Sequence, residues 1–275
     1  MRKYTSAARM PLWKWILCLL GGLILFFLLY GFSEMGVELP LVPWAVMGIA
    51  VGTGLFGLFV YAVWTNLTER RPVTELAMKR TWADLGLGLL LGVCYFAVVV
   101  GLMALAGSYR ITEAHFAFLP LLTYFLHFFM VAVYEEIIFR GIIFRLIDDR
   151  WNTAAALIVS ALLFGAVHLA NPGATLWGAF AIAVEAGLLL GAAYKWSGTL
   201  WLPIGIHWAW NFVQGNVLGF AVSGNPVPDK IFSAIISGPE WITGGLFGAE
   251  ASVPAVVVGL LLTMILLSRC KRDER

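Results

Sequence analysis

Residues 84–107 read DLGLGLLLGVCYFAVVVGLMALAG, an apolar run with a single acidic residue at its start. A helix of about 20 residues is needed to cross the ~30 Å hydrocarbon layer of a bilayer, so this run is long enough to span it. The whole chain has the same character, because 61% of its 275 residues are hydrophobic and only 12% are charged. A soluble globular domain needs far less apolar side chain. The sequence therefore predicts a membrane protein.

Runs of similar length recur along the chain, each bounded by polar, Pro or Gly residues. They predict an all-α polytopic membrane helix bundle of about eight transmembrane helices. The predicted spans are approximately 12–32, 41–64, 84–107, 116–146, 152–170, 174–194, 199–220 and 253–268. The first run is too long for the apolar region of a secretory signal, so we expect it to be retained. With no second soluble domain, residues 1–275 should form a single membrane domain.

The basic residues predict the orientation, because short cytoplasmic segments hold most of the Lys and Arg. With the N-terminus inside and eight crossings, fifteen of the 18 Lys and Arg residues fall on the inner side. Only Arg110 and Lys230 fall outside, and Arg140 lies within a span. We therefore expect a bacterial cell-membrane protein with both termini in the cytoplasm. The net charge of +2 gives no indication of nucleic acid binding.

Small residues and one long loop complete the outline. Three Gly-x-x-x-Gly pairs predict close helix packing and no functional role; they are Gly48/Gly52, Gly88/Gly92 and Gly187/Gly191. The loop at about 221–252 is rich in Gly, Pro and Asn, which is compatible with a lid, a re-entrant segment or a plain connection. The three cysteines are scattered, so they offer neither a disulfide framework nor a clustered metal spacing.

Several polar side chains lie deep inside predicted spans, where each ionisable group costs several kcal/mol unless it is paired or faces a wet cavity. Such residues are functional candidates by default. They are Glu135, Glu136, Arg140, His168, Glu185, His207 and Asn211, with His127 as a further candidate. For Glu185 we prefer a clamp between helices, and for His127 a structural or interfacial role.

Helical spacing separates the two adjacent glutamates. Glu136 and Arg140 are four residues apart on one helix face, where a carboxylate and a guanidinium can pair. Glu135 points about 100° away and can face a different neighbour. A carboxylate in low dielectric near another negative charge has the surroundings of a general base. A structural ion pair that locks two helices remains the alternative.

The histidines follow the same spacing. His168 shares a helix face with Phe164, and His207 shares one with Asn211, so both imidazoles can aim at one cavity. A lone histidine in a membrane would favour an interhelical hydrogen bond. Two histidines, an amide and an acid pair on three separate spans favour a site instead.

The three motifs Glu135-Glu136-x-x-x-Arg140, Phe164-x-x-x-His168 and His207-x-x-x-Asn211 stand in this order on successive predicted helices. Together they resemble the CPBP family, also called ABI, which includes type II CAAX prenyl proteases and bacteriocin-processing proteins. The resemblance covers a protease-like core of about 71–220.

This resemblance implies an α bundle of about eight helices and a set of roles. Glu135 would be the base that activates water, supported by Glu136 and Arg140. His168 would be a second contact to the water, and His207 with Asn211 would stabilise the oxyanion. No cofactor is certain, and a divalent metal such as zinc stays open because two His and a Glu form a reasonable zinc set. If a divalent metal is present, its ligands would be Glu135, His168 and His207.

We therefore predict an intramembrane endopeptidase that hydrolyses a peptide bond of a membrane-associated protein or peptide within the lipid bilayer. The alternative is a non-catalytic scaffold or a proton-coupled carrier, in which the buried Glu and His residues form a relay. An enzyme needs its polar groups around one water, whereas a relay strings them along a path. One difficulty accompanies the prediction, because the span borders place Glu135 near mid-membrane but His168 near the outer end of its helix.

Overall fold

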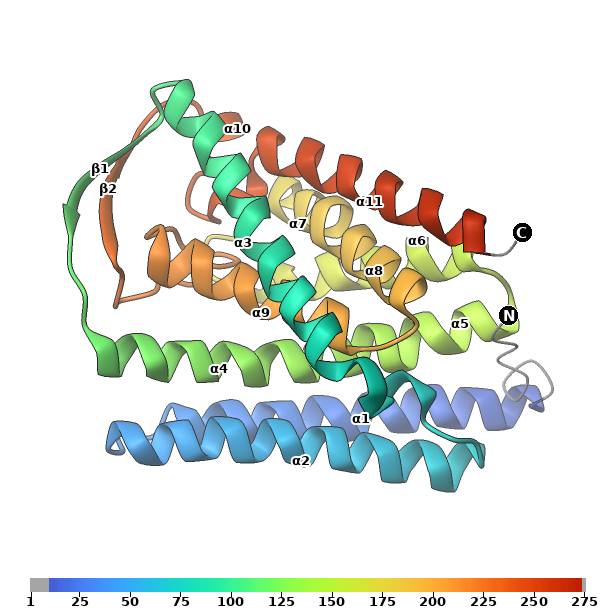
Figure 1. Ribbon diagram of the computed structural model, residues 1–275. Coiled ribbons are helices and arrows are strands. Elements are labelled where there is room, and N and C mark those ends of the chain that lie inside the picture. The colour runs from blue at the N-terminus through green and yellow to red at the C-terminus, as the bar shows by residue number, and fades with distance from the viewer. Residues whose placement is uncertain (1–9, 274–275) are drawn as a thin grey trace.

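The computed structural model describes residues 10–273 and confirms an all-α polytopic bundle (Figure 1). Predictions that concern Arg2, Lys3, Arg9 and Arg275 lie outside the described residues. The α-helices are α1 (Leu12–Val37), α2 (Pro43–Glu69), α3 (Thr81–Leu105), α4 (Phe118–Glu136), α5 (Arg145–Arg150), α6 (Thr153–Val167), α7 (Leu176–Ile182), α8 (Leu188–Ser197), α9 (Trp201–Phe212), α10 (Glu240–Thr243) and α11 (Val253–Asp273). Short 3-10 turns are η2 (Thr74–Leu76), η3 (Met78–Arg80), η5 (His168–Ala170) and η8 (Ala249–Ala251). Three π-helical segments, η4 (Ile137–Phe144), η6 (Ala183–Gly187) and η7 (Val213–Val217), continue α4, α7 and α9.

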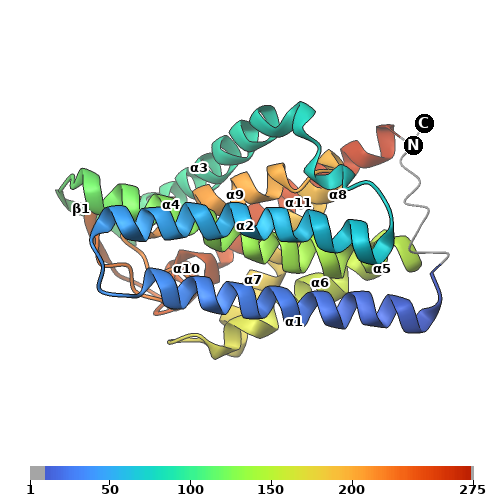
Figure 2. The same cartoon turned by 90° about the horizontal axis from the view of Figure 1, so that it is seen from below.

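The long helices run roughly along one direction, with α3 crossing them at an angle (Figures 1 and 2). The hairpin of α1 and α2 lies along α4 and α5, and α9 lies inside the bundle with α3 packed against it. At one end, β1 (Tyr109–Ala114) pairs antiparallel with β2 (Phe232–Ile236), which joins two segments predicted as loops. The helices bury their apolar faces against one another and leave the outer faces for lipid.

Seven helical segments of the described chain are long and apolar enough to cross a bilayer. The predicted span 199–220 differs from the other seven, because α9 has 12 residues and continues through only five residues of η7. Nearly all α9 side chains are buried. An apolar run indicates burial, but it does not tell whether lipid or protein surrounds the helix.

Two of the three Gly-x-x-x-Gly pairs lie at close helix contacts. A Cβ on Gly88 would lie 2.5 Å from the Leu202 carbonyl oxygen, so only glycine lets α3 approach α9 this closely. A Cβ on Gly187 would likewise lie 2.8 Å from the Ala161 Cα. Gly48 and Gly52 have no neighbouring atom within 4 Å of such a Cβ, so the packing prediction is wrong for that pair.

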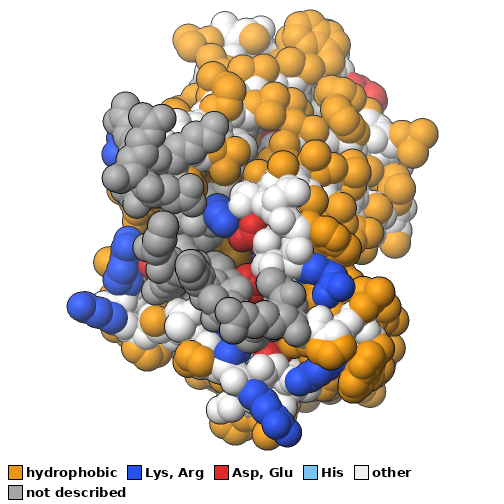
Figure 3. Space-filling model, turned by 90° about the vertical axis from the view of Figure 1, so that its right-hand side faces the viewer, with side chains coloured by type: hydrophobic (Ala, Val, Ile, Leu, Met, Phe, Trp, Pro, Cys, Tyr) orange, Lys and Arg blue, Asp and Glu red, His pale blue; other side chains and the backbone are white. Residues whose placement is uncertain are grey.

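The end of the bundle that holds the chain termini is rimmed by Lys and Arg side chains (Figure 3). Two arginines counted there as orienting charges are paired with buried carboxylates. Arg145 donates to both oxygens of Glu69, and Arg71 donates to both oxygens of Glu75. This cluster ties the end of α2 to α5 and to the segment before α3.

Candidate active site

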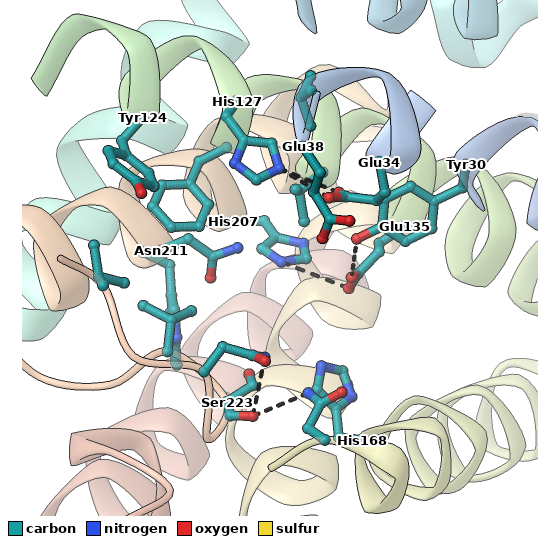
Figure 4. Close-up of a pocket in the computed structure, with 18 of the residues that line it drawn as sticks. Tyr30, Glu34, Glu38, Tyr124, His127, Glu135, His168, His207, Asn211 and Ser223 are labelled. Carbon is teal, nitrogen blue, oxygen red and sulfur yellow. Dashed lines mark hydrogen bonds and ion pairs between the residues drawn. The ribbon is translucent and has the colours of Figure 1, made fainter. Parts of the chain in front are cut away.

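A cavity of about 960 Å³ lies between α1, α4, α6 and α9, and the segment 222–229 closes one side of it. Its lining runs from Glu38 and Leu41, next to the α1–α2 turn, to Ile138 and Leu190 within the bundle. The cavity wall includes four of the six predicted catalytic residues, Glu135, His168, His207 and Asn211. Figure 4 shows these side chains and their neighbours from α1.

The turn between α5 and α6 brings Glu135 and His168 to the same depth. The two helices are antiparallel, and Glu135 precedes Trp151 by as many residues as His168 follows Asn152. Equal residue counts give equal rise along two antiparallel helices. The predicted depth conflict is thereby resolved, because the hairpin turn sets His168 level with Glu135 even though His168 lies at the far end of α6.

Phenylalanine pairing in the same hairpin agrees with this register. Phe139 and Phe164 stand at equal distances from the turn, and their ring centroids are 4.9 Å apart. Phe164 also packs against the imidazoles of His168 and His207, at 4.8 Å and 6.0 Å between centroids. Phe164 is therefore an apolar partition between the two histidines.

Glu135 has one occupied and one free carboxylate oxygen. Oε1 accepts a hydrogen bond of 3.3 Å from the Tyr30 hydroxyl of α1. Oε2 has no hydrogen-bond partner and lies 3.7 Å from His207 Nε2. Oε2 is almost completely shielded from solvent in this structure, so a buried acceptor is left without a donor. A water that donated to both Oε2 and His207 Nε2 would lie about 2.8 Å from each atom.

Glu136 does not line the cavity and is completely buried. Its Oε1 accepts a 2.8 Å hydrogen bond from Arg140 Nη1 and lies 2.9 Å from His207 Nδ1. Arg140 Nη2 donates to the carbonyl oxygens of Ala186 and Gly187 at 3.3 Å and 3.1 Å. Arg140 lies in the π-helical segment η4, and segments of this kind are frequent at functional sites. The predicted pair of Glu136 and Arg140 is present and also holds His207.

Hydrogen-bond chemistry determines which nitrogen of each histidine is available. His168 Nδ1 lies 2.6 Å from the Phe164 carbonyl oxygen, which can only accept, so Nδ1 carries a hydrogen. His168 Nε2 has no partner in the described chain and belongs to the cavity wall. In His207, Nδ1–H donates a hydrogen bond to the Glu136 carboxylate, so Nε2 carries no hydrogen and faces Glu135. Both rings therefore present Nε2 to the cavity.

The Asn211 carboxamide has no hydrogen bond to any described residue, although the residue is only 6% exposed. It stands one helical turn after His207 and lines the same cavity. A buried amide without partners is unfavourable, so this group is held ready for a ligand or water.

Residues of α1 and of the segment before α11, which the sequence motifs did not indicate, also reach the cavity. Tyr30 and Glu34 of α1 lie four residues apart and face Glu135 and His127, with Glu34 Oε2 3.1 Å from His127 Nε2. The spacing of Tyr30, Glu34 and Glu38 along an apolar helix was the available signal.

Glu250 also lines the cavity, and no local sequence pattern predicted this position. It accepts hydrogen bonds from the Ser223 backbone N–H and from Trp210 Nε1, the latter at 3.3 Å. Burial raises the pKa of Glu250 above its usual range. Asn171 Nδ2 donates to the Ser223 carbonyl at 2.9 Å, so the loop around Ser223 is fastened from both sides. Within the predicted loop 221–252, residues 222–227 are thus a wall of the cavity.

Glu185 lies away from the cavity, completely buried in η6. Its Oε2 lies 2.5 Å from the Tyr95 hydroxyl of α3, and Gly259 of α11 packs directly against its backbone. These contacts match the predicted clamp between helices.

The possible zinc set does not assemble in this geometry. Among the described residues, no three His, Cys, Asp or Glu side chains are arranged to hold a metal ion. Phe164 packs against the rings of both histidines, and within the described chain His168 forms no hydrogen bond or ion pair with Glu135 or His207.

The fold and this site define a polytopic membrane protein with an acid, two imidazoles and an amide around one intramembrane cavity. Residues 117–213 match the family model described as type II CAAX prenyl endopeptidase Rce1-like. This match confirms the family resemblance that the three motifs predicted. No curated protein matches the chain.

Proposed function

We propose that this protein is an intramembrane endopeptidase in which Glu135 activates water for attack on a peptide bond. The observation that carries the proposal is the free Oε2 of Glu135, which faces His207 Nε2 at 3.7 Å inside the cavity. Water held there would be deprotonated by Glu135 while its oxygen bonds to the substrate carbonyl carbon. A positioned general base of this kind contributes typically 10²–10⁴-fold to a rate.

Asn211 supports the next stage of the reaction. As the carbonyl becomes an oxyanion, the unpaired Asn211 amide N–H₂ is available to donate to it. Preorganised donors aimed at developing charge often supply the largest part of catalysis. The proton taken by Glu135 then passes to the leaving amine nitrogen as the C–N bond breaks, which restores the carboxylate.

Glu136 and Arg140 act on this chemistry through His207. The Glu136 carboxylate accepts from Nδ1 and so orients the ring with Nε2 toward the water. Arg140 balances the charge of Glu136 within the apolar interior. Their role is to position the ring, since neither side chain lines the cavity.

Convergence on one cavity supports an enzyme over a proton relay, which would distribute the same groups along a path. The substrate would be a membrane-associated protein or peptide, and both chain termini would be cytoplasmic by the distribution of basic residues. Metal-free hydrolysis is the proposed mechanism. Cleavage that survives dialysis against a chelator supports it, and activity that returns only on addition of zinc would contradict it.

The test compares membranes that contain the wild-type protein with membranes that contain Glu135→Gln, Glu135→Ala or Asn211→Ala. Mass spectrometry of membrane peptides should show products with the wild type that are absent with both Glu135 variants, and reduced by about 10²-fold or more for Asn211→Ala. Glu113→Gln, an exposed carboxylate on β1, is the control and should cleave normally. Full activity in either Glu135 variant would refute the proposal.

A further inference from the structure

The charges around the cavity are strongly one-sided. Five acidic side chains line it, namely Glu34, Glu38, Glu135, Asp229 and Glu250, and no Lys or Arg of the described residues does. Within the part of the chain that the structure describes, three histidines are the only lining side chains that can carry positive charge. In a cavity with low-dielectric walls, charges of one sign focus the field and concentrate counter-charged ligands.

The carboxylates nearest the mouth have little compensation. Glu34 is paired only with His127, and within residues 10–273 neither Glu38 nor Asp229 makes an ion pair. Because Glu38 is exposed and Asp229 is half-buried, both can be reached by an entering ligand. The mouth therefore offers free negative charge.

The interior of the same cavity independently indicates a ligand. Asn211 is more than nine-tenths buried, has no hydrogen-bond partner in the described chain and lines the cavity beside His207. Apolar side chains such as Phe27, Val131 and Phe139 also line the cavity. An apolar stretch of peptide fits these walls, with an amide near Asn211.

We propose that the cavity selects substrates that carry a basic residue close to the scissile bond, bound by Glu34 and Glu38. The inference rests on the proposed function, since it names the class of peptide that Glu135 would cleave. Tyr30, which contacts Glu135, and the two carboxylates follow one another at four-residue spacing along α1. Figure 4 shows Glu34 and Glu38 on the same side of the cavity as Tyr30.

Helix geometry converts this arrangement into a spacing in the substrate. At 1.5 Å per residue, Glu34 and Glu38 lie about 6 Å and 12 Å beyond Tyr30 along the axis. An extended peptide advances about 3.3 Å per residue. A Lys or Arg two to four residues from the scissile bond, on the side toward the mouth, would reach these carboxylates.

Binding is measured on the full-length Glu135→Gln protein, so that turnover does not interfere. Two fluorescent peptides share one apolar segment and differ only in a tail that contains either two Lys or two Gln residues. The protein is held in nanodiscs of phosphatidylcholine, which has no net charge, and binding is followed by anisotropy. We expect the Lys peptide to bind about tenfold more tightly, equivalent to about 1.4 kcal/mol. Added salt should reduce this preference, because the mouth is exposed to solvent.

Glu34→Gln and Glu38→Gln, introduced together, should reduce the preference to about twofold or less. Glu38→Gln alone serves as a second variant, because this exposed side chain makes no ion pair in the described chain and its loss should not affect folding. Glu113→Gln is the matched control, with the same change of charge outside the cavity. Equal binding of the two peptides overturns the proposal, as does an undiminished preference in the double variant or a preference that the control also loses.

Cleavage by the wild-type protein gives the second readout. Cleavage sites mapped in a peptide library should be enriched in Lys or Arg two to four positions from the scissile bond, and the double Gln variant should lose this enrichment. Unbiased sites overturn the inference while leaving the endopeptidase intact. If nothing is cleaved but the Lys peptide is still preferred in binding, the proposed function fails and the charge selectivity stands.

Discussion

Replacement of Arg140 by Met tests how the buried scaffold supports the site. The guanidinium is completely buried and its strongest contact is the 2.8 Å pair with Glu136. Removing one partner of a buried ion pair typically costs about 3–5 kcal/mol, because the other charge is left without compensation. The lost hydrogen bonds to the Ala186 and Gly187 carbonyls add about 1 kcal/mol each at most.

This cost can be measured in detergent by tryptophan fluorescence during heating. A loss of 3–5 kcal/mol corresponds to a fall of roughly 6–20 °C in the unfolding midpoint for a protein of this size. The double variant Arg140→Met with Glu136→Leu should recover about 2 kcal/mol or more of the loss, because it leaves no unpaired charge. It should nevertheless stay inactive, since His207 loses the acceptor of its Nδ1 hydrogen.

Two results would refute this reasoning. The first is an Arg140→Met protein as stable as the wild type, and the second is a double variant no more stable than the single one. Arg110→Met is the control, because Arg110 is exposed on β1 and forms no ion pair in the described chain. Its midpoint should change by less than about 2 °C.

Three further predictions concern the cavity wall. Tyr30→Phe removes the hydroxyl that donates to Glu135, so we expect kcat to fall about tenfold with little change in KM or stability; an unchanged kcat would show that Tyr30 does not position the base. Gly224→Ala forces a side chain onto a backbone with φ of +81°, where its Cβ would lie 1.8 Å from the Pro172 carbonyl oxygen, and should cost about 2 kcal/mol or more together with most of the activity. Glu250→Gln should flatten the pH dependence of the free energy of unfolding. Burial raises the pKa of Glu250, so the folded state binds this proton more tightly than the unfolded state does. The stability contributed by the protonated Glu250 is therefore lost as the pH rises above the ordinary pKa of 4.5.

Controls keep the last two predictions specific. Gly107 also has a positive φ, of +74°, but a Cβ there would meet no atom within 4 Å, so Gly107→Ala should cost about 1–2 kcal/mol and leave cleavage intact. For Glu250, thermal unfolding is followed from about pH 4 to pH 7 in wild type and variant. If the unfolding midpoints of wild type and variant changed with pH in parallel over this range, the raised pKa of Glu250 would be contradicted.

The motif residues could be predicted from the sequence because each sits in an otherwise apolar helix. Burying a charged group in such surroundings is so unfavourable that Glu135, Glu136 and Arg140 could be identified as candidate site residues from the sequence. Helical spacing then predicted correctly that Glu136 and Arg140 pair while Glu135 faces elsewhere. The depth of His168 could also have been predicted from equal residue counts on both sides of the α5–α6 turn.

Other parts of the site depended on contacts between segments far apart in the chain. Glu250 sits in a loop without periodicity, and only the folded chain shows that Ser223 and Trp210 hold it at the cavity. The pairing of β1 with β2 has the same origin, since exposed strands of five or six residues carry no strong local signal. Apolar runs also do not distinguish the internal helix α9 from a helix that faces lipid.

The amino-acid sequence by itself determined that this protein is a membrane helix bundle and which of its polar residues are candidates for a site. It did so because hydrophobicity, helical period and the free energy of burying charge are properties of short segments. Only the tertiary structure decided what those residues face: Tyr30 on Glu135, a 3.7 Å gap to His207, and a mouth lined by carboxylates. Distances of this kind depend on how separate helices pack, and that packing follows from the shapes of all their side chains together.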